Sequence, residues 1–258
     1  MIQFTKMHGI GNDYVYIDCT KNSDVKDIPG LARAISDRHF GVGSDGLILI
    51  YSSDIADFKM KIFNSDGSEA EMCGNGIRCV GKFVYDKGLT DKKTVTVETL
   101  AGIKTLELHI GVAEMVETVT VDMGEPIFCP DKIPVIIDNN TNEEFPKAKL
   151  KAEDKEFDFN FISMGNPHAI TVIENIKNFN IEKYGSILER DKHFPNRINV
   201  EFIELVSRDK IKMRVWERGS GETLACGTGA TASVVACAMN GIINRKAKVE
   251  LLRWRTRI

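Results

Sequence analysis

The sequence predicts an α+β protein that contains two similar domains, and three observations support this. Runs of alternating or continuous apolar residues recur along the chain, as in β-strands, whereas helical patterns are few. The length of 258 residues suits one large domain or two small ones. A segment of the first half also recurs in the second half, 153 positions further on, so that Cys73 aligns with Cys226.

The expected elements follow from these patterns in chain order. The strands are expected at residues 2–7, 14–18, 47–51, 58–63, 94–99, 103–110, 118–121, 157–163, 169–173, 200–206 and 211–216. The helices are expected at residues 28–38, 76–86, 181–190 and 229–239. In the second helix, the apolar face is formed by Ile77, Val80, Phe83 and Val84. Residues 130–151 are rich in Pro, Asn and charge, which indicates a boundary region or a surface excursion.

The repeat gives the domain organisation. FKMKIFNSDGSEAEMCGNG (58–76) lies over IKMRVWERGSGETLACGTG (211–229) without a gap, and Asn64 falls on Glu217. A nearby offset places Gly-Asn-Asp (11–13) over Gly-Asn-Pro (165–167). A period this long indicates a duplicated domain and excludes a solenoid. We therefore expect domains at residues 1–117 and 118–258, related by a pseudo-twofold axis.

Composition excludes several classes of protein. With 34 basic and 37 acidic residues, the formal charge is −3, which argues against broad binding to nucleic acid or anionic membranes. Apolar residues make up 43% of the chain, enough for a core, and no apolar run approaches the roughly 18 residues of a spanning helix. The N-terminus lacks the apolar core of a signal peptide, so a cytoplasmic protein is expected. The six cysteines form no CxxC pair and do not cluster with histidines, so we expect no metal site.

The repeated segment places a cysteine where a helix begins. The free N–H groups and the dipole of a helix N-terminus favour an anion, which predicts a lowered pKa for Cys73 and Cys226. The same N–H groups can hold a substrate carboxylate, because glycine lets the backbone approach closely. The expected donors are Gly74, Asn75, Gly227 and Thr228.

Two such thiols suit a reaction with mirror symmetry. One thiolate removes a proton from carbon, and the opposite thiol returns a proton to the other face, which inverts a stereocentre. The helix N-termini stabilise the negative charge that develops on the carboxylate. This scheme requires no cofactor.

The sequence resembles the diaminopimelate epimerase family. The motifs that carry the resemblance are KMHGIGNDY (6–14), RHFGVGSDGL (38–47), FNSDGSEAEMCGNGIRC (63–79), SMGNPHA (163–169), FPNRIN (194–199) and ERGSGETLACGTGA (217–230). They span almost the whole chain. The resemblance implies two pseudo-symmetric domains, each a mixed β-sheet or barrel around a central helix. It also implies interconversion of LL- and meso-diaminopimelate in lysine and peptidoglycan precursor biosynthesis, and a possible homodimer.

The resemblance also assigns roles to single residues. Cys73 and Cys226 are the acid and base, assisted by His168 and Glu217. Arg218 pairs with the distal carboxylate, for which a planar guanidinium is well suited. One binding position that is often glutamine in the family is Gly46 here. The substrate contacts are completed by Asn12, Asn64, Asn166 and Asn199, although the asparagines could instead stabilise turns and His168 could be structural.

Two other functions remain open at this stage. A related racemase could act on a proline-like amino acid, but a monocarboxylate substrate would not need Arg218. An inactive paralogue could retain the fold as a binding module, against which both cysteines argue.

The segment after Leu252 departs from the family pattern, because RWRTRI (253–258) is basic and does not alternate. We hypothesise a one-base frameshift after Leu252, with a naturally short variant as the other interpretation. A frameshift would remove the last strands of the second domain, expose an apolar sheet edge and weaken the case for a dimer.

Overall fold

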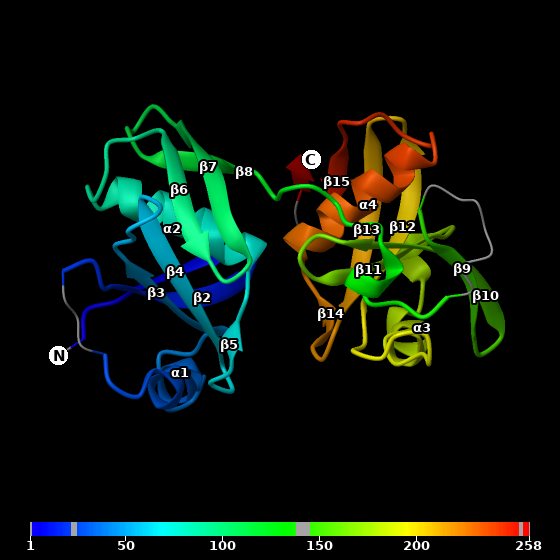
Figure 1. Ribbon diagram of the computed structural model, residues 1–258, viewed down its shortest axis with the longest axis horizontal. Coiled ribbons are helices and arrows are strands. Elements are labelled where there is room, and N and C mark those ends of the chain that lie inside the picture. The colour runs from blue at the N-terminus through cyan, green and yellow to red at the C-terminus, as the bar shows by residue number, and fades with distance from the viewer. Residues whose placement is uncertain (1, 22–24, 138–144, 253–254, 258) are drawn as a thin grey trace. The chain divides into compact units, whose positions relative to one another are not determined.

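The computed structural model describes residues 2–21, 25–137, 145–252 and 255–257. The chain divides into two compact units, Met1–Asp122 and Met123–Ile258. In Figure 1 the first unit is coloured blue to green and the second green to red. The expected boundary between residues 117 and 118 lies within a strand of the first unit, Val116–Val121.

Unit 1 consists of one mixed sheet and two helices. The sheet order is β1-β2-β3-β4-β6-β7-β8, and β5 pairs with β4. The two helices are α1 (Ile28–Ser36) and α2 (Gly74–Asp86). The strands are β1 (Thr5–Gly9), β2 (Asn12–Asp18), β3 (Gly46–Tyr51), β4 (Phe58–Asn64), β5 (Glu69–Ala70), β6 (Thr94–Thr99), β7 (Gly102–Ile110) and β8 (Val116–Val121).

Unit 2 repeats this arrangement. Its sheet order is β16-β15-β13-β12-β11-β10-β9, and β14 pairs with β13. Its α-helices are α3 (Ile181–Leu188) and α4 (Gly227–Met239), and Pro130–Lys132 and Ile176–Asn178 form short 3-10 turns. The strands are β9 (Lys147–Ala152), β10 (Lys155–Ser163), β11 (Pro167–Val172), β12 (Asn199–Ser207), β13 (Lys210–Glu217), β14 (Gly221–Thr223), β15 (Lys248–Glu250) and β16 (Arg255–Arg257).

The duplication seen in the sequence extends through the fold. Helices α2 and α4 each have 13 residues and begin directly after the aligned cysteines. The neighbouring strands correspond as well: β2-β3 and β11-β12 are parallel pairs, whereas β3-β4 and β12-β13 are antiparallel. The predicted α+β class with two repeated domains is therefore confirmed.

Each sheet packs its apolar residues against a helix of its own unit. The face of α2 predicted from the sequence is buried, and it joins residues of β2, β3, β4, β6 and β7 in one core cluster. On the other side of the sheet, Val15, Leu47 and Leu49 pack with α1. In unit 2, a third cluster contains Phe157, Phe202 and other aromatic side chains of β10, β12 and α3. The apolar positions predicted from the sequence thus form the cores of the two units.

Two segments differ from expectation. The region 130–151, expected to be a boundary or surface excursion, includes most of β9, which pairs with β10 and adds an edge strand to unit 2. At the other edge of the same sheet, β16 pairs antiparallel with β15, so part of the basic tail extends the sheet. Arg253, Trp254 and Ile258 lie outside the described residues.

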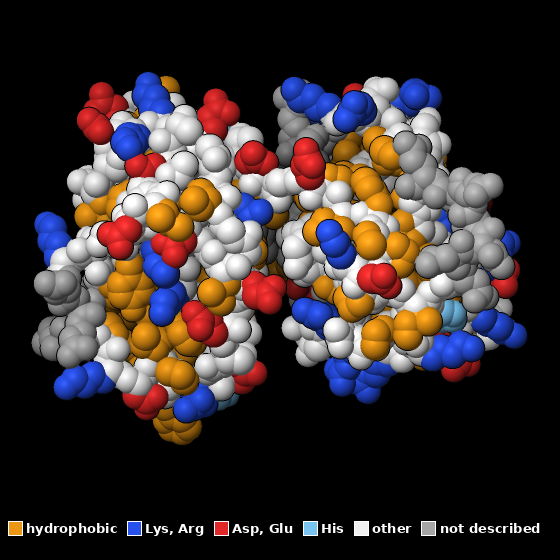
Figure 2. Space-filling model, in the orientation of Figure 1, with side chains coloured by type: hydrophobic (Ala, Val, Ile, Leu, Met, Phe, Trp, Pro, Cys, Tyr) orange, Lys and Arg blue, Asp and Glu red, His pale blue; other side chains and the backbone are white. Residues whose placement is uncertain are grey.

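None of the helices in the described part of the chain is both long enough and apolar enough to cross a bilayer. On the face shown in Figure 2, acidic and basic side chains are interspersed over both units.

Candidate active site

Cys73 is the N-cap of α2. Its backbone is extended, and its Sγ accepts a hydrogen bond of 3.3 Å from the N–H of Gly76. The thiol also donates to Oδ1 of Asn12 at 3.3 Å, and Cys73 is only partly buried. Because the first N–H groups of a helix have no partner within it, Gly74 and Asn75 lie where an anion would be held. The structure therefore places four predicted residues together, Asn12, Cys73, Gly74 and Asn75.

Asn12 connects Cys73 to a network that the sequence did not reveal. Its Nδ2 donates to Asp45 at 2.7 Å, and its Oδ1 is 3.4 Å from Nδ2 of Asn75. Oδ1 of Asn75 accepts a 2.7 Å bond from Arg78, one turn further along α2. Burial lowers the pKa of Arg78, and the neighbouring thiol of Cys73 counteracts this. Asp45 and Arg78 lie within the motifs that carry the family resemblance, but no role was predicted for either residue.

A second set of charges supports the same loop. Arg38 donates to Asp13 at 2.8 and 3.2 Å and to Asp45 at 2.8 Å. Burial would raise the pKa of Asp13, but the hydrogen bonds and charges of Arg38 and Lys6 outweigh it and lower this pKa to about 2. The ion pair with Arg38 thus holds Asp45 where it accepts the hydrogen bond from Nδ2 of Asn12.

Asn64 and Gly46 face each other across β3 and β4. Asn64 lies at the end of β4 and donates to Oγ of Ser68 at 3.0 Å. A Cβ added to Gly46 would lie 2.2 Å from the carbonyl oxygen of Phe63 and 2.8 Å from Cε1 of Tyr14. With this backbone, only glycine fits at this position.

Cys226 repeats the geometry of Cys73 in unit 2. It is the N-cap of α4, and its Sγ accepts a 3.4 Å bond from the N–H of Gly229. Its Sγ is also 3.3 Å from Oγ1 of Thr228. Gly227 and Thr228 open the helix as Gly74 and Asn75 open α2. Both predicted carboxylate sites thus lie at helix N-termini.

The predicted direction of the pKa shift at Cys226 is wrong. Burial raises the pKa of this thiol well above its ordinary value, and the charges of Glu217 and Glu201 add to the effect. The bonds from Thr228 and Gly229 lower the pKa but do not offset the loss of solvent. The prediction from the sequence rested on the helix N-terminus alone, whereas desolvation has the larger effect on the pKa of this thiol.

His168 is fully buried in β11 and has a polar partner at each ring nitrogen. Its Nδ1 is 2.7 Å from Oε1 of Glu201, and its Nε2 is 3.0 Å from Oδ1 of Asn166. The sequence reasoning identified His168 and Asn166 but missed Glu201. The available signal was a carboxylate between Val200 and Phe202, within an otherwise apolar strand.

The remaining predicted residues of unit 2 gather where β13 ends. Glu217 is the last residue of β13 and accepts a short hydrogen bond from Thr223. Asn199 accepts from the backbone N–H of Arg218 at 2.9 Å and donates to the carbonyl of Pro167 at 2.8 Å. The exposed guanidinium of Arg218 is 3.4 Å from the carbonyl oxygen of Asn196. Asn199 therefore has a structural role that also positions Arg218.

The other cysteines do not cap the two helices. Cys79 is in the core of unit 1, and burial raises its pKa. Cys19 and Cys237 are also buried, and burial raises the pKa of Cys237 to about 11. Cys129 is exposed. Within the described residues, no group of three or more His, Cys, Asp or Glu side chains could hold a metal ion.

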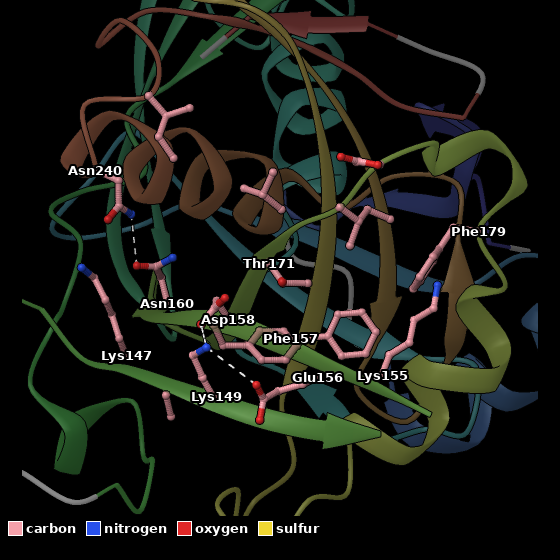
Figure 3. A pocket seen from close by; sticks show the side chains of 16 residues that line it. Lys147, Lys149, Lys155, Glu156, Phe157, Asp158, Asn160, Thr171, Phe179 and Asn240 are labelled. Atoms are coloured by element: carbon pink, nitrogen blue, oxygen red, sulfur yellow. Dashed lines mark hydrogen bonds and ion pairs between the residues drawn. The ribbon is translucent and has the colours of Figure 1, made fainter. Parts of the chain in front are cut away.

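A pocket of about 770 Å³ lies elsewhere in unit 2 (Figure 3). It is formed by strands β9, β10 and β11 and by the C-terminal end of α4, where Asn240 donates to Asn160. Lysine and carboxylate side chains pair at its mouth, as between Lys149 and Asp158. None of the predicted site residues lines it, so we do not assign the reaction to this pocket.

Comparison with solved structures defines the class of fold. A hydroxyproline epimerase from Agrobacterium vitis matches with a TM-score of 0.66 and 14% identity, over 96% of this chain and 80% of that one. A probable proline racemase from Agrobacterium radiobacter K84 matches with a TM-score of 0.67 and 15% identity, over 96% and 81%. A PhzF-family protein from Bacillus anthracis matches with a TM-score of 0.64 and 19% identity, over 99% and 87%. The chain thus has the two-domain fold found in these epimerase, racemase and PhzF proteins.

Sequence comparison identifies the family within that class. The family model described as diaminopimelate epimerase matches residues 4–129 and 160–253. Diaminopimelate epimerases from Methanococcus maripaludis strain S2 and from Acetivibrio thermocellus are each 55% identical over 253 residues. The alignments cover 97% of this chain and 89% and 88% of those proteins. The chain belongs to the diaminopimelate epimerase family.

Proposed function

We propose that this protein is a cofactor-independent isomerase that interconverts LL- and meso-diaminopimelate with two thiols. The observation that carries the proposal is the pair of cysteine N-caps, Cys73 and Cys226, at the same place in two repeated units. Membership of the family supports the choice of substrate.

In the proposed reaction, one sulfur, as thiolate, takes the proton from the α-carbon, and the C–H electron pair delocalises into the carboxylate. The other sulfur, as thiol, gives its proton to the opposite face of the same carbon. One S–H bond forms and one breaks, so the enzyme ends with its thiols exchanged in protonation. This scheme requires a site that excludes water, because a carbon acid is only weakly acidic.

The helix N-termini have a direct role in this scheme. The N–H groups of Gly74, Asn75, Gly227 and Thr228 would hold the α-carboxylate and stabilise the charge that develops on it. No side chain has to move for this, since backbone donors in the first turn of a helix are already oriented.

The side chains around these termini would determine specificity. Arg218 would pair with the distal carboxylate, and Glu217 would accept the substrate ammonium. Asn199 would also contact the substrate, and its hydrogen bond from the backbone N–H of Arg218 would help to position Arg218. His168 would assist proton transfer. The remaining proposed contacts are Asn12, Asn64 and Asn166.

A cytoplasmic location fits this chemistry, because the reaction needs reduced thiols. A homodimer stays a prediction, and light scattering of the purified chain would test it.

The test is conversion of LL-diaminopimelate by the purified protein under reducing conditions, read by chiral chromatography. We expect meso-diaminopimelate to form until equilibrium, and no racemisation of proline or trans-4-hydroxyproline in parallel reactions. Racemisation of a proline-type substrate without turnover of diaminopimelate would favour the second candidate, whose fold the chain shares. Inactivity on all of these substrates would favour the binding-module interpretation.

A further inference from the structure

Glu201 is a buried carboxylate that has no role in the reaction proposed above. Glu201 and His168 are both 0% exposed, and Oε1 of Glu201 is 2.7 Å from Nδ1 of His168. Within the described part of the chain, its Oε2 is buried and makes no hydrogen bond. Burying a carboxylate is costly even when it is paired, so its presence in a core strand needs an explanation.

The position of Glu201 links it to the second thiol. A Cβ placed on Gly229 would lie 2.5 Å from Oε1 of Glu201 and 3.3 Å from Cβ of Cys226. The carboxylate therefore lies against the first turn of α4, beside the cysteine that caps it. Glu217, from β13, is the other carboxylate close enough to influence Cys226.

The repeat shows that the fold does not require a charge here. The counterpart of Glu201 in unit 1 is Ile48, because a Cβ on Gly76 would lie 2.7 Å from Cδ1 of Ile48 and 3.5 Å from Cβ of Cys73. The counterpart of His168 is Tyr14, since His168 pairs with the first residue of β12 as Tyr14 pairs with the first residue of β3.

A tyrosine and an isoleucine thus fill the place that His168 and Glu201 fill in unit 2. All four side chains are buried, so the difference concerns charge and not exposure. The two thiols therefore lie in repeated backbone geometry but in unequal electrostatic surroundings.

We propose that Glu201 is a positioning residue that makes the two thiols unequal, by fixing the ring of His168 and by keeping Cys226 protonated before the substrate binds. The inference rests on the proposed two-thiol function, because it assigns the resting proton of that pair. A carboxylate oxygen accepts hydrogen bonds, so Nδ1 of His168 donates to Glu201, which fixes the orientation of the ring with Nε2 toward Asn166. The same negative charge disfavours a thiolate at Cys226.

This assignment has a mechanistic consequence. With Cys226 as the resting proton donor, Cys73 is left as the proton acceptor when the substrate arrives. A two-base isomerase needs one thiol and one thiolate at the start of each turnover. Glu201 would create this difference in protonation between the two thiols without contacting the substrate itself.

The experiment is a pH titration of thiolate absorbance in the full chain without substrate. The signal of Cys226 is the spectrum of the chain minus that of the same chain with Cys226→Ala, and the signal of Cys73 is obtained likewise with Cys73→Ala. In Glu201→Gln, we expect the Cys226 midpoint to move to lower pH and the Cys73 midpoint to stay. An unmoved Cys226 midpoint, or equal movement of both, would overturn the proposal.

Glu204→Gln is the matched control. Glu204 lies on the same strand but pairs with Lys212 and the N–H of Ile176, away from both thiols. It should leave both midpoints and the turnover rate unchanged.

Glu201→Gln should lower kcat by at least about tenfold, as expected when a group that orients a general acid or base loses its charge. The alkaline limb of its kcat/KM profile should move to lower pH.

A second variant addresses folding. His168→Tyr with Glu201→Ile installs the pair that unit 1 already buries, and its Cys226 midpoint should also move to lower pH. A folded double variant with the wild-type midpoint would contradict the proposal.

In the unmodified chain, nitrogen NMR of the His168 ring should show a proton on Nδ1, and an unprotonated Nδ1 would contradict the proposal too. These readouts need no turnover, so a chain that fails to epimerise diaminopimelate would refute the function without deciding the role of Glu201.

Discussion

Arg38→Met tests whether the charges around Asp13 stabilise the loop that carries Asn12. Arg38 makes three hydrogen bonds to Asp13 and Asp45, and the pKa of Asp13 is lowered from its ordinary 3.8 to about 2. At about 1.4 kcal/mol per pKa unit, that shift corresponds to at most about 2.5 kcal/mol of stability. Lys6 shares this effect, and the side chain of Arg38 is 54% exposed, so solvent screening reduces it. We expect the substitution to cost about 1 kcal/mol at pH 7.

The dependence on pH follows from the sign of the shift. Because the folded-state pKa of Asp13 lies below the unfolded value, its contribution is present above about pH 4 and is lost as the pH falls toward 2. Urea unfolding should show a midpoint about 0.3–1 M lower than wild type at pH 7. The gap should shrink to roughly half at pH 3.

A matched control is Arg208→Met, which removes an exposed arginine in the turn between β12 and β13. It should shift the midpoint little at either pH. A gap for Arg38→Met that is equally large at pH 3 and pH 7, or absent at pH 7, would refute the reasoning.

Three further predictions concern specificity, packing and thiol reactivity. Arg218→Met should raise KM for diaminopimelate by tenfold or more, because a substrate carboxylate loses its partner, and an unchanged KM would place the distal contact elsewhere. Gly46→Ala should destabilise the chain by about 1–3 kcal/mol, since its Cβ would overlap the carbonyl of Phe63, and wild-type stability in thermal unfolding would contradict that geometry. Cys129 should be alkylated by iodoacetamide near pH 8 well before Cys237, whose pKa burial raises to about 11, and the reverse order in peptide mass spectrometry would count against the assigned exposure.

Much of the fold could be predicted from the sequence because the relevant signals are local. Among the described residues, α1, α2 and α3 each have a clear apolar face, and the repeated Cys-Gly-x-Gly segment marks where α2 and α4 begin. The short strands β5 and β14 were missed, because two or three residues hold too little pattern. β9 was missed because its alternating lysines resemble a solvated loop.

The site was harder to predict where long-range packing decides it. The helix terminus predicts an acidic thiol, but burial beside Glu201 and Glu217 reverses the direction at Cys226. This burial depends on how β12 and β13 pack around Cys226, which the local pattern at the start of the helix does not specify. The same holds for Gly46, whose need for glycine comes from Phe63 and Tyr14 across the sheet.

Proton exchange in heavy water shows whether Cys73 and Cys226 act on opposite faces of one carbon. LL-diaminopimelate is incubated with the wild-type chain, Cys73→Ala, Cys226→Ala and, as a control at a buried cysteine away from the site, Cys237→Ala. Mass spectrometry and chiral separation at early times then show where deuterium enters.

For the wild type and Cys237→Ala, we predict meso product with one solvent deuterium at the inverted carbon, while the remaining LL substrate stays nearly unlabelled. Neither single active-site alanine variant should produce meso product. Product that keeps the substrate hydrogen, or near wild-type epimerisation by either of these two variants, would contradict the two-thiol mechanism.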